Sequence, residues 1–160
     1  MRIIGGLARG TKLYTLEGLN TRPTLDKVRE AIFNILQNSI TDSVVFDLFA
    51  GSGAVGLESI SRGAKKAILC DKNKQAIQII DKNAQKMRVE DKVQILCIDY
   101  EKFLNNTQEN FDFIYIDPPY NTDYISNSIK LINDRNLLAE DGIIIAETDE
   151  EERVKDEIDK

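Results

Sequence analysis

Five short apolar runs, separated by amphipathic stretches, constrain the fold of this chain more than any other feature. Rich in Val, Ile, Leu and Phe, the runs cover residues 43–47, 66–71, 93–98, 111–116 and 142–147. Such runs are typical of buried parallel strands. The stretches before and between them have helical spacing, over residues 24–37, 57–62, 73–88 and 124–133. Strands that alternate with helices form a mostly parallel sheet with right-handed crossovers and helices on both faces. We therefore predict one α/β domain over residues 1–160, with its core in residues 24–147.

The composition narrows the chemistry available to the chain. None of the 160 residues is histidine, which excludes Ser-His-Asp and Cys-His nucleophilic catalysis and most zinc sites, so we expect no bound metal. Any catalysis must use carboxylates, hydroxyl and backbone groups, or the reactivity of a cofactor. Cys70 and Cys97 lie in apolar runs and are predicted to be buried, reduced thiols of a cytoplasmic protein. No apolar run approaches the ~20 residues of a membrane-spanning helix.

The amino-terminal region is basic, although the chain as a whole has a net charge of −6. Residues 1–30 carry six basic and three acidic side chains, and Gly5, Gly6 and Gly10 separate two short extended pieces within residues 1–20. These features predict a small β-hairpin or extended arm, followed by a helix with Thr24 as its N-cap. Lys27 and Arg29 near the helix start could contact phosphate or be solvated. The basic side chains of the arm could likewise contact phosphate or be solvated. Charge alone favours a solvated surface. The candidate RNA contacts are Arg2, Arg9 and Lys12 in the arm and Arg22 near the start of the helix.

A glycine-rich loop follows the first apolar run. Gly51, Gly53 and Gly56 form a G-x-G-x-x-G pattern, which permits a tight turn and close approach of the backbone to a ligand. Dinucleotide-binding proteins use this loop for a pyrophosphate, but here Asp47 precedes the glycines. A carboxylate in this position would repel a phosphate and suits a cationic ligand, such as the amino group of S-adenosylmethionine. The alternative is a purely structural turn between strand and helix.

Acidic residues also follow the second and third apolar runs. Asp71 comes about 20 residues after Gly51, the spacing at which a carboxylate reaches the ribose hydroxyls of a nucleoside. An aspartate that caps the next helix is an equally simple interpretation. Asp99 and Tyr100 follow the third run. At this edge of a parallel sheet, a polar residue could contact an adenine amino group while the aromatic ring flanks the base.

The fourth run ends in the tetrapeptide Asp117-Pro118-Pro119-Tyr120. Its prolines fix the backbone and leave their carbonyl oxygens free as hydrogen-bond acceptors. A planar substrate with an exocyclic amino group suits this turn. The ring would stack on Tyr120, while Asp117 and the Pro118 carbonyl accept the two amine hydrogens. An ordinary Asp-Pro turn after a strand is the alternative.

Taken together, these segments resemble class I S-adenosylmethionine-dependent methyltransferases, and more closely the RsmD family of 16S rRNA guanine-N2 methyltransferases. The resemblance rests on residues 2–6, 9–13, 21–24, 28–36, 47–53 and 117–120. It implies a Rossmann-like fold, S-adenosylmethionine as cofactor, and methylation of a guanine in 16S rRNA, within the assembling small ribosomal subunit. The cofactor would be held by Asp47, Phe49, Ala50, Gly51, Ser52, Gly53 and Asp71, with Asp99 and Tyr100 at its adenine. The guanine would be held by Asp117, Pro118, Pro119 and Tyr120.

One departure from the family pattern concerns the carboxyl-terminal end. Class I methyltransferases usually finish with a β-hairpin that adds an antiparallel strand beside the fifth one. This sequence ends before any such pair of strands. Either the protein is truncated or this sequence is incomplete, and in both cases the sheet edge beyond the fifth strand is in doubt; an exposed edge would invite pairing with another chain.

Other functions account for parts of the same pattern. An adenine-N6 DNA methyltransferase uses the same tetrapeptide, but usually has an additional target-recognition region for which 160 residues leave no room. A protein-glutamine methyltransferase more typically has Asn in place of Asp117. A nicotinamide-dependent dehydrogenase shares the glycine loop but has no role for Asp47. A non-catalytic RNA-binding module has no use for carboxylates that repel phosphate.

Overall fold

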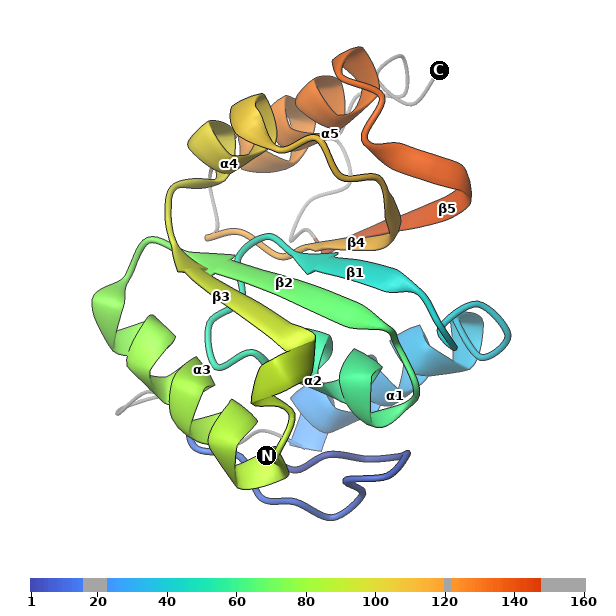
Figure 1. The fold of residues 1–160 in the computed structure, drawn as a ribbon, viewed down its shortest axis with the longest axis vertical. Coiled ribbons are helices and arrows are strands. Elements are labelled where there is room, and N and C mark those ends of the chain that lie inside the picture. Colours follow the sequence, from blue (N-terminus) through green and yellow to red (C-terminus); the bar gives the residue numbers. More distant parts are fainter. Residues whose placement is uncertain (16–22, 120–121, 148–160) are drawn as a thin grey trace.

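Five parallel strands form one sheet in the computed structural model, which describes residues 1–15, 23–119 and 122–147. Their order across the sheet is β3-β2-β1-β4-β5, and every neighbouring pair is parallel (Figure 1). The strands are β1 Val44–Asp47, β2 Lys66–Asp71, β3 Val93–Cys97, β4 Phe111–Ile116 and β5 Leu138–Ala146. The direction of the strand order reverses between β1 and β4. In an open parallel sheet, a ligand crevice forms at the carboxyl ends of such a pair.

Helices cover both faces of this sheet (Figure 1). On one face lie α1 (Pro23–Ile35), α2 (Ala54–Ser61) and α3 (Lys74–Met87), and on the other α4 (Tyr100–Asn106) and α5 (Tyr124–Asp134). A short 3₁₀ helix, Glu90–Lys92, precedes β3. The arrangement is the α/β architecture that the alternating apolar pattern predicts.

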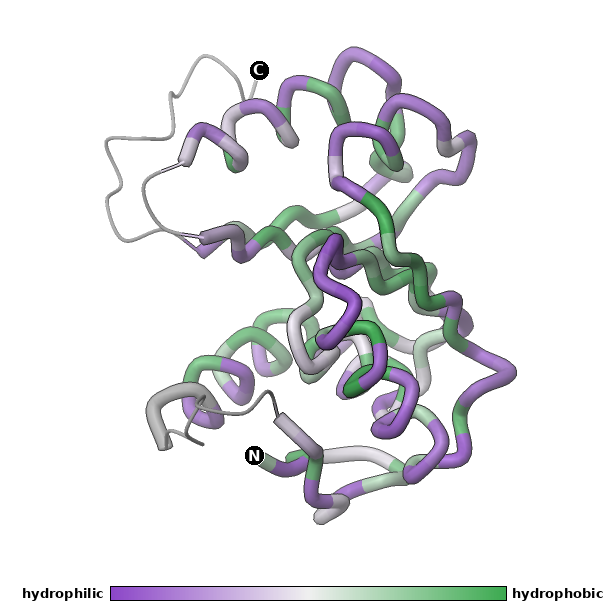
Figure 2. The backbone as a smooth tube through the Cα atoms, turned by 90° about the vertical axis from the view of Figure 1, so that its left-hand side faces the viewer, coloured by the Kyte–Doolittle hydropathy of each residue, from purple (hydrophilic) through white to green (hydrophobic). Residues whose placement is uncertain are grey.

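A separate hydrophobic core lies on each face of the sheet. Successive residues of a strand point to opposite faces, so Val45 packs with α1, α2 and α3, whereas Phe46 packs with α4 and α5. In the second core, the rings of Phe46 and Phe111 stack with their centroids 4.9 Å apart. Figure 2 shows the hydrophobic segments concentrated on the central strands and the hydrophilic ones on the outer turns. Among the described residues, no helix is long and apolar enough to cross a membrane.

Several elements differ from the sequence prediction, among them α2, which begins at Ala54, three residues earlier than predicted. α1 begins at Pro23 and therefore is not capped by Thr24, because proline suits the first helical position, where no backbone N–H is needed. β5 begins at Leu138, four residues earlier than predicted. A register shift against β4 and a φ of 63° at Asp141 interrupt the regular pattern that marks a strand. The seven-residue helix α4 was not predicted, because so short a helix gives too few apolar repeats.

The prediction for the two cysteines is half right. Cys70 is buried in β2, whereas Cys97, the last residue of β3, is exposed. Both are free thiols. β3 is the outermost strand on its side of the sheet, which explains why its last residue is less covered than a residue of β2.

Residues 1–15 form an arm with a single antiparallel bridge, between Arg2 and Lys12. The backbone N–H of Ile3 donates to the Thr11 carbonyl at 2.8 Å. The predicted arm is therefore present, but its pairing is too short for two strands of a hairpin. The rest of the predicted amino-terminal segment lies outside the described residues.

A buried carboxylate on α2, that of Glu58, holds this arm in place. It accepts hydrogen bonds from the backbone N–H groups of Ile4 and Gly5, both at 2.9 Å. It also pairs with the guanidinium groups of Arg29, at 3.2 Å, and Arg62, at 2.8 Å. Arg29 is buried and donates to a backbone carbonyl of the arm as well, so it is not the solvated side chain considered from the sequence.

Replacing Glu58 by alanine is expected to destabilise the fold by about 3–5 kcal/mol, because the buried Arg29 would lose its buried ionic partner and keep only the partly exposed Asp26. Urea unfolding followed by circular dichroism measures the change. Lys130→Ala is the control, since it removes an exposed ion pair on α5 that contributes about 0.5 kcal/mol or less. Equal losses in the two variants would show that Glu58 does not anchor the arm.

Candidate active site

Carboxylate side chains follow all five strands at one edge of the sheet. Asp47 and Asp71 end β1 and β2, Asp99 and Asp117 follow β3 and β4, and Glu147 follows β5. This is the edge at which open parallel sheets bind ligands. The sequence pattern indicated the first four as site residues. It indicated Glu147 only as the end of a strand.

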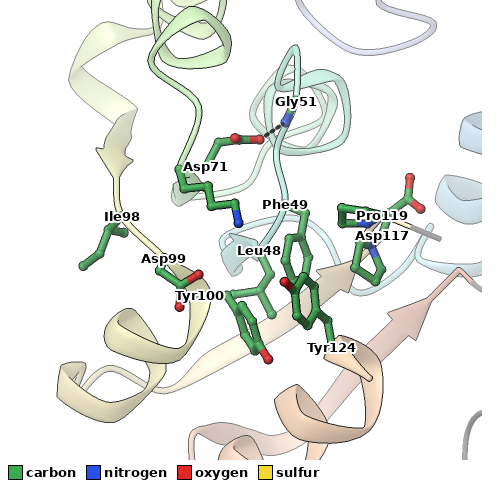
Figure 3. Close-up of a pocket in the computed structure, with 12 residues that line it drawn as sticks. Leu48, Phe49, Gly51, Asp71, Ile98, Asp99, Tyr100, Asp117, Pro119 and Tyr124 are labelled. Carbon is green, nitrogen blue, oxygen red and sulfur yellow. Dashed lines mark hydrogen bonds between the residues drawn. The ribbon is translucent and has the colours of Figure 1, made fainter. Parts of the chain in front are cut away.

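The larger of two cavities at this edge has a volume of about 550 Å³ (Figure 3). It extends over the ends of β1, β2, β3 and β4, and Asp71, Asp99 and Asp117 contribute to its lining. The sequence indicated Asp71 and Asp99 as ligands of a nucleoside and Asp117 as a ligand of an amine. The structure brings all three side chains together in one cavity.

The smaller cavity, about 270 Å³, adjoins the larger one on the side of α1 and the arm. Its lining includes Asp47, Ala50, Ser52 and Glu147. Phe49, Gly51 and Asp117 line both cavities. The two cavities are therefore neighbouring parts of one crevice, and Asp117 lies where they meet.

The glycine loop adopts a backbone shape that favours glycine. The φ angles of Gly51 and Gly53 are 58° and 83°. A Cβ atom on Gly53 would come within 3.1–3.2 Å of side-chain atoms of Leu69 and Ile80, whereas a Cβ on Gly51 would meet no atom within 4 Å. The loop is therefore packed against β2 and α3 at Gly53 and open toward the crevice at Gly51.

Asp71 is held in place by two backbone N–H groups. Its Oδ2 accepts from Gly51 at 3.0 Å (Figure 3). Its Oδ1 accepts from Asn73 at 2.9 Å. The side chain that caps α3 is that of Asn73, which accepts from Gln75. Asp71 is therefore not the helix cap considered from the sequence. Each carboxylate oxygen can accept a second hydrogen bond, so Asp71 can still bind a hydroxyl group in the larger cavity.

Three aromatic rings form one wall of the larger cavity. Phe49 and Tyr124 stack with centroids 5.7 Å apart and 2° between their planes, and Tyr100 contacts both rings, at 5.2 and 4.9 Å (Figure 3). Tyr100 is buried, so it supports this wall, while the half-buried Phe49 and Tyr124 are more open to a ligand. Tyr124 was missed as a site residue, because its place beside the cavity depends on the packing of α5 against α4. Asp99 caps α4 by accepting from the Glu101 N–H at 3.1 Å.

Asp47 presents an unpaired acceptor inside the crevice. Its Oδ2 accepts from the Gly56 N–H at 3.1 Å, whereas Oδ1 is buried and has no hydrogen-bond partner among the described residues. Burial raises the pKa of Asp47 to about 7, the hydrogen bond from Gly56 opposes this shift, and the charges of Asp117 and Asp71 add to it. Since an unpaired buried carboxylate is costly, this side chain suits a cationic donor such as an ammonium group.

Asp117 lies at the junction of the two cavities, from which its side chain remains accessible. Partial burial raises its pKa to about 7, and the charge and hydrogen bond of Glu147 add to the shift. Pro118 is buried and Pro119 is exposed, and both line the larger cavity. Tyr120 lies outside the described residues, so its stacking on a substrate ring stays a prediction.

Asn83 on α3 links the glycine loop to the arm. Its Oδ1 accepts from the Tyr14 N–H at 2.7 Å, and its side-chain nitrogen donates to the carbonyls of Tyr14 and Ser52, both at 3.0 Å. The side chain is fully buried. Nothing in the sequence marks this role, because Asn83 is one polar residue on an otherwise apolar helix face.

Three of the four basic side chains considered for RNA contact lie on the arm. Arg2, Arg9 and Lys12 are exposed, and Met1 of the same arm lines the smaller cavity. The arm therefore borders the crevice. Arg22 falls outside the described residues, and contact of any of these residues with RNA stays a prediction.

Comparison with known proteins shows the family. The family described as conserved hypothetical protein 95 matches residues 1–160. The chain belongs to this family. Similar proteins include YlbH of Bacillus subtilis, 37% identical over 154 residues, which cover 94% of this chain and 84% of YlbH. Ribosomal RNA small subunit methyltransferase D of Haemophilus influenzae is 35% identical over 155 residues, which cover 94% of this chain and 80% of that protein. These relatives confirm that the chain is RsmD-like, whereas its place among the 16S rRNA guanine-N2 methyltransferases stays a prediction.

Solved structures confirm the fold. YhhF of Escherichia coli superposes with a TM-score of 0.87 at 34% identity, over 98% of this chain and 86% of YhhF. An S-adenosylmethionine-dependent methyltransferase of Agrobacterium tumefaciens shares the fold at a TM-score of 0.67 and 18% identity, over 80% of this chain and 45% of that protein. The predicted class I methyltransferase fold is therefore present, which agrees with the S-adenosylmethionine predicted as cofactor.

Proposed function

We propose that this family member transfers a methyl group from S-adenosylmethionine to the exocyclic N2 amine of a guanine in small-subunit rRNA. The observation that carries the proposal is the position of Asp117, which follows β4 at the junction of the two cavities and precedes two prolines. Relatives 34–35% identical to the chain are named ribosomal RNA small subunit methyltransferases, which supports the choice of RNA.

The lining of the crevice suits both ends of S-adenosylmethionine. Asp71 and Asp99 would hold the nucleoside in the larger cavity, beside the half-buried rings of Phe49 and Tyr124. The unpaired Oδ1 of Asp47 would accept a hydrogen bond from the ammonium group in the smaller cavity. When bound, the cofactor supplies a methyl group that is already activated on a sulfonium.

The chain's own contribution is to orient the amine. The nitrogen of an exocyclic amine shares its lone pair with the ring, which makes it a poor nucleophile. Hydrogen bonds from its N–H groups to the Asp117 carboxylate and the Pro118 carbonyl would favour a pyramidal nitrogen with a directed lone pair. Orientation of this kind contributes up to about 7–11 kcal/mol in well-aligned reactions. The base must leave any helical stack to reach the crevice.

Methyl incorporation tests the proposal directly. Small-subunit particles that lack the modification are incubated with the protein and labelled S-adenosylmethionine, and the RNA is digested to nucleosides. We expect label in N2-methylguanosine. Label in N6-methyladenine of a DNA substrate, with none in the RNA, would instead assign the protein to the adenine-N6 DNA methyltransferases.

A further inference from the structure

Glu147 leaves the sheet beside Asp117. In the register of β4 and β5, Ile116 lies opposite Ala146, so the next residues, Asp117 and Glu147, follow on neighbouring strands. The Glu147 N–H donates to the Ile116 carbonyl at 2.9 Å, which extends the pairing one residue beyond β5. The backbone therefore fixes Glu147 at the same edge as Asp117.

Tyr115 holds the Glu147 carboxylate beside Asp117. The hydroxyl of the buried Tyr115 donates to its Oε2 at 2.5 Å. Burial raises the pKa of Tyr115, and the neighbouring carboxylates add to the shift. The hydroxyl therefore stays protonated and remains a donor. Asp117 lines the smaller cavity together with Glu147, and the charge and hydrogen bond of Glu147 add to the raised pKa of Asp117. Because an ionised carboxylate only accepts, a hydrogen bond between two carboxyl groups requires that they share one proton.

The groups that face this pair favour such sharing. Asp47 of β1 adds a third carboxylate to the smaller cavity. Arg29 of α1 lines the cavity as well, but its guanidinium is paired with a buried carboxylate of α2. Met1 contributes the terminal amino group, whose pKa is lowered, chiefly by burial. Adjacent carboxylates with little compensating positive charge titrate as a pair rather than separately.

We propose that Asp117 and Glu147 work as one carboxylic acid pair, which orients the acceptor amine and then takes up its proton. The proposal rests on the proposed function for the identity of the amine. Asp117 contacts the amine, whereas Glu147 is a positioning residue that acts through Asp117.

The proton released in the methyl transfer is taken up by the carboxyl pair. As the N–CH₃ bond forms and the S–CH₃ bond breaks, the nitrogen becomes positively charged and the sulfonium becomes a neutral thioether. The N–H bond then breaks, its electron pair stays on nitrogen, and the proton passes to the ionised member of the pair. Both carboxyl groups are then neutral, and water removes one proton before the next turnover.

Glu147→Gln tests this role, with Glu140→Gln, an exposed site on the same strand, as its matched control. Glutamine keeps an acceptor for Tyr115 but removes the titratable group. In single-turnover methyl transfer, we expect the maximal rate to fall about 10²-fold, at the lower end of what acid–base groups contribute. The apparent pKa of the pH–rate profile should also fall in Glu147→Gln and stay unchanged in Glu140→Gln. Glu147→Asp should recover part of both losses.

A carbon NMR titration of the Asp117 carboxyl group in the free protein requires no substrate. We expect its pKa, about 7 in the native protein, to fall toward the ordinary range in Glu147→Gln. An unchanged titration would overturn the pair, whatever the activity. A native protein that leaves guanosine unlabelled would overturn the proposed function instead, and the titration would still decide whether the pair exists.

Discussion

Replacement of Asp117 by alanine is expected to lower the rate of methyl transfer about 10²–10⁴-fold, the range that a positioned acid–base group contributes. The carboxylate lies where the two cavities meet, and under the proposed function its loss removes the acceptor for an amine hydrogen. The cavities themselves remain, since Asp117 is accessible and follows the last residue of β4. Binding of S-adenosylhomocysteine should therefore change far less than the rate.

Single-turnover methyl transfer and calorimetric titration with S-adenosylhomocysteine separate these two effects. Asp134→Ala is the matched control, because Asp134 is an exposed aspartate at the end of α5 whose ion pair with Lys130 lies on the surface. A rate in Asp117→Ala equal to that of the control would remove Asp117 from the mechanism.

Replacement of Asp47 by asparagine is expected to weaken the binding of S-adenosylhomocysteine about 10–150-fold. Hydrogen bonds to charged groups contribute about 1.5–3 kcal/mol, and each 1.4 kcal/mol corresponds to a factor of ten in affinity. Asparagine can still accept from the Gly56 N–H, but its other side-chain atom is a donor and cannot pair with an ammonium group. If Asp47→Asn bound S-adenosylhomocysteine as tightly as the native protein does, Asp47 would not contact the ligand.

The same substitution should change how stability depends on pH. Burial raises the pKa of Asp47 to about 7 in the folded protein, whereas in the unfolded chain it is about 4. Between these values the folded state binds the proton more tightly, so the contribution of Asp47 to stability falls as the pH rises from about 4 to 7. Urea unfolding at pH 5 and pH 8 should show a smaller loss of stability in Asp47→Asn than in the native protein or in Asp134→Asn.

Much of the fold and of the crevice could be predicted because the relevant features are local in sequence. The glycines of the loop and Asp117 each follow an apolar run directly, and parallel strands bring their carboxyl ends to one edge. A reader of the sequence can therefore place Asp47, Asp71 and Asp117 in one crevice without knowing the order of the strands.

The features that escaped prediction depend on contacts between distant segments. Arg29 pairs with Glu58, 29 residues away, and neither residue has a local pattern that indicates burial. The role of Glu147 arises from the register of β4 and β5, which the sequence of β5 alone does not specify. Tyr124 becomes a cavity residue only through the packing of helices whose relative position the periodicity of α5 leaves open.

The hydrogen bonds of Asn83 have a consequence for how the arm and the glycine loop respond to change. One buried side chain satisfies backbone groups of both Tyr14 and Ser52, so displacing either segment costs hydrogen bonds of the same buried amide. The changes in the free energy of unfolding caused by substitutions in the two segments are then not additive, because both include the loss of hydrogen bonds to this amide. The arm that borders the crevice and the loop that lines it therefore form one thermodynamic unit, although 38 residues separate Tyr14 from Ser52 in the chain.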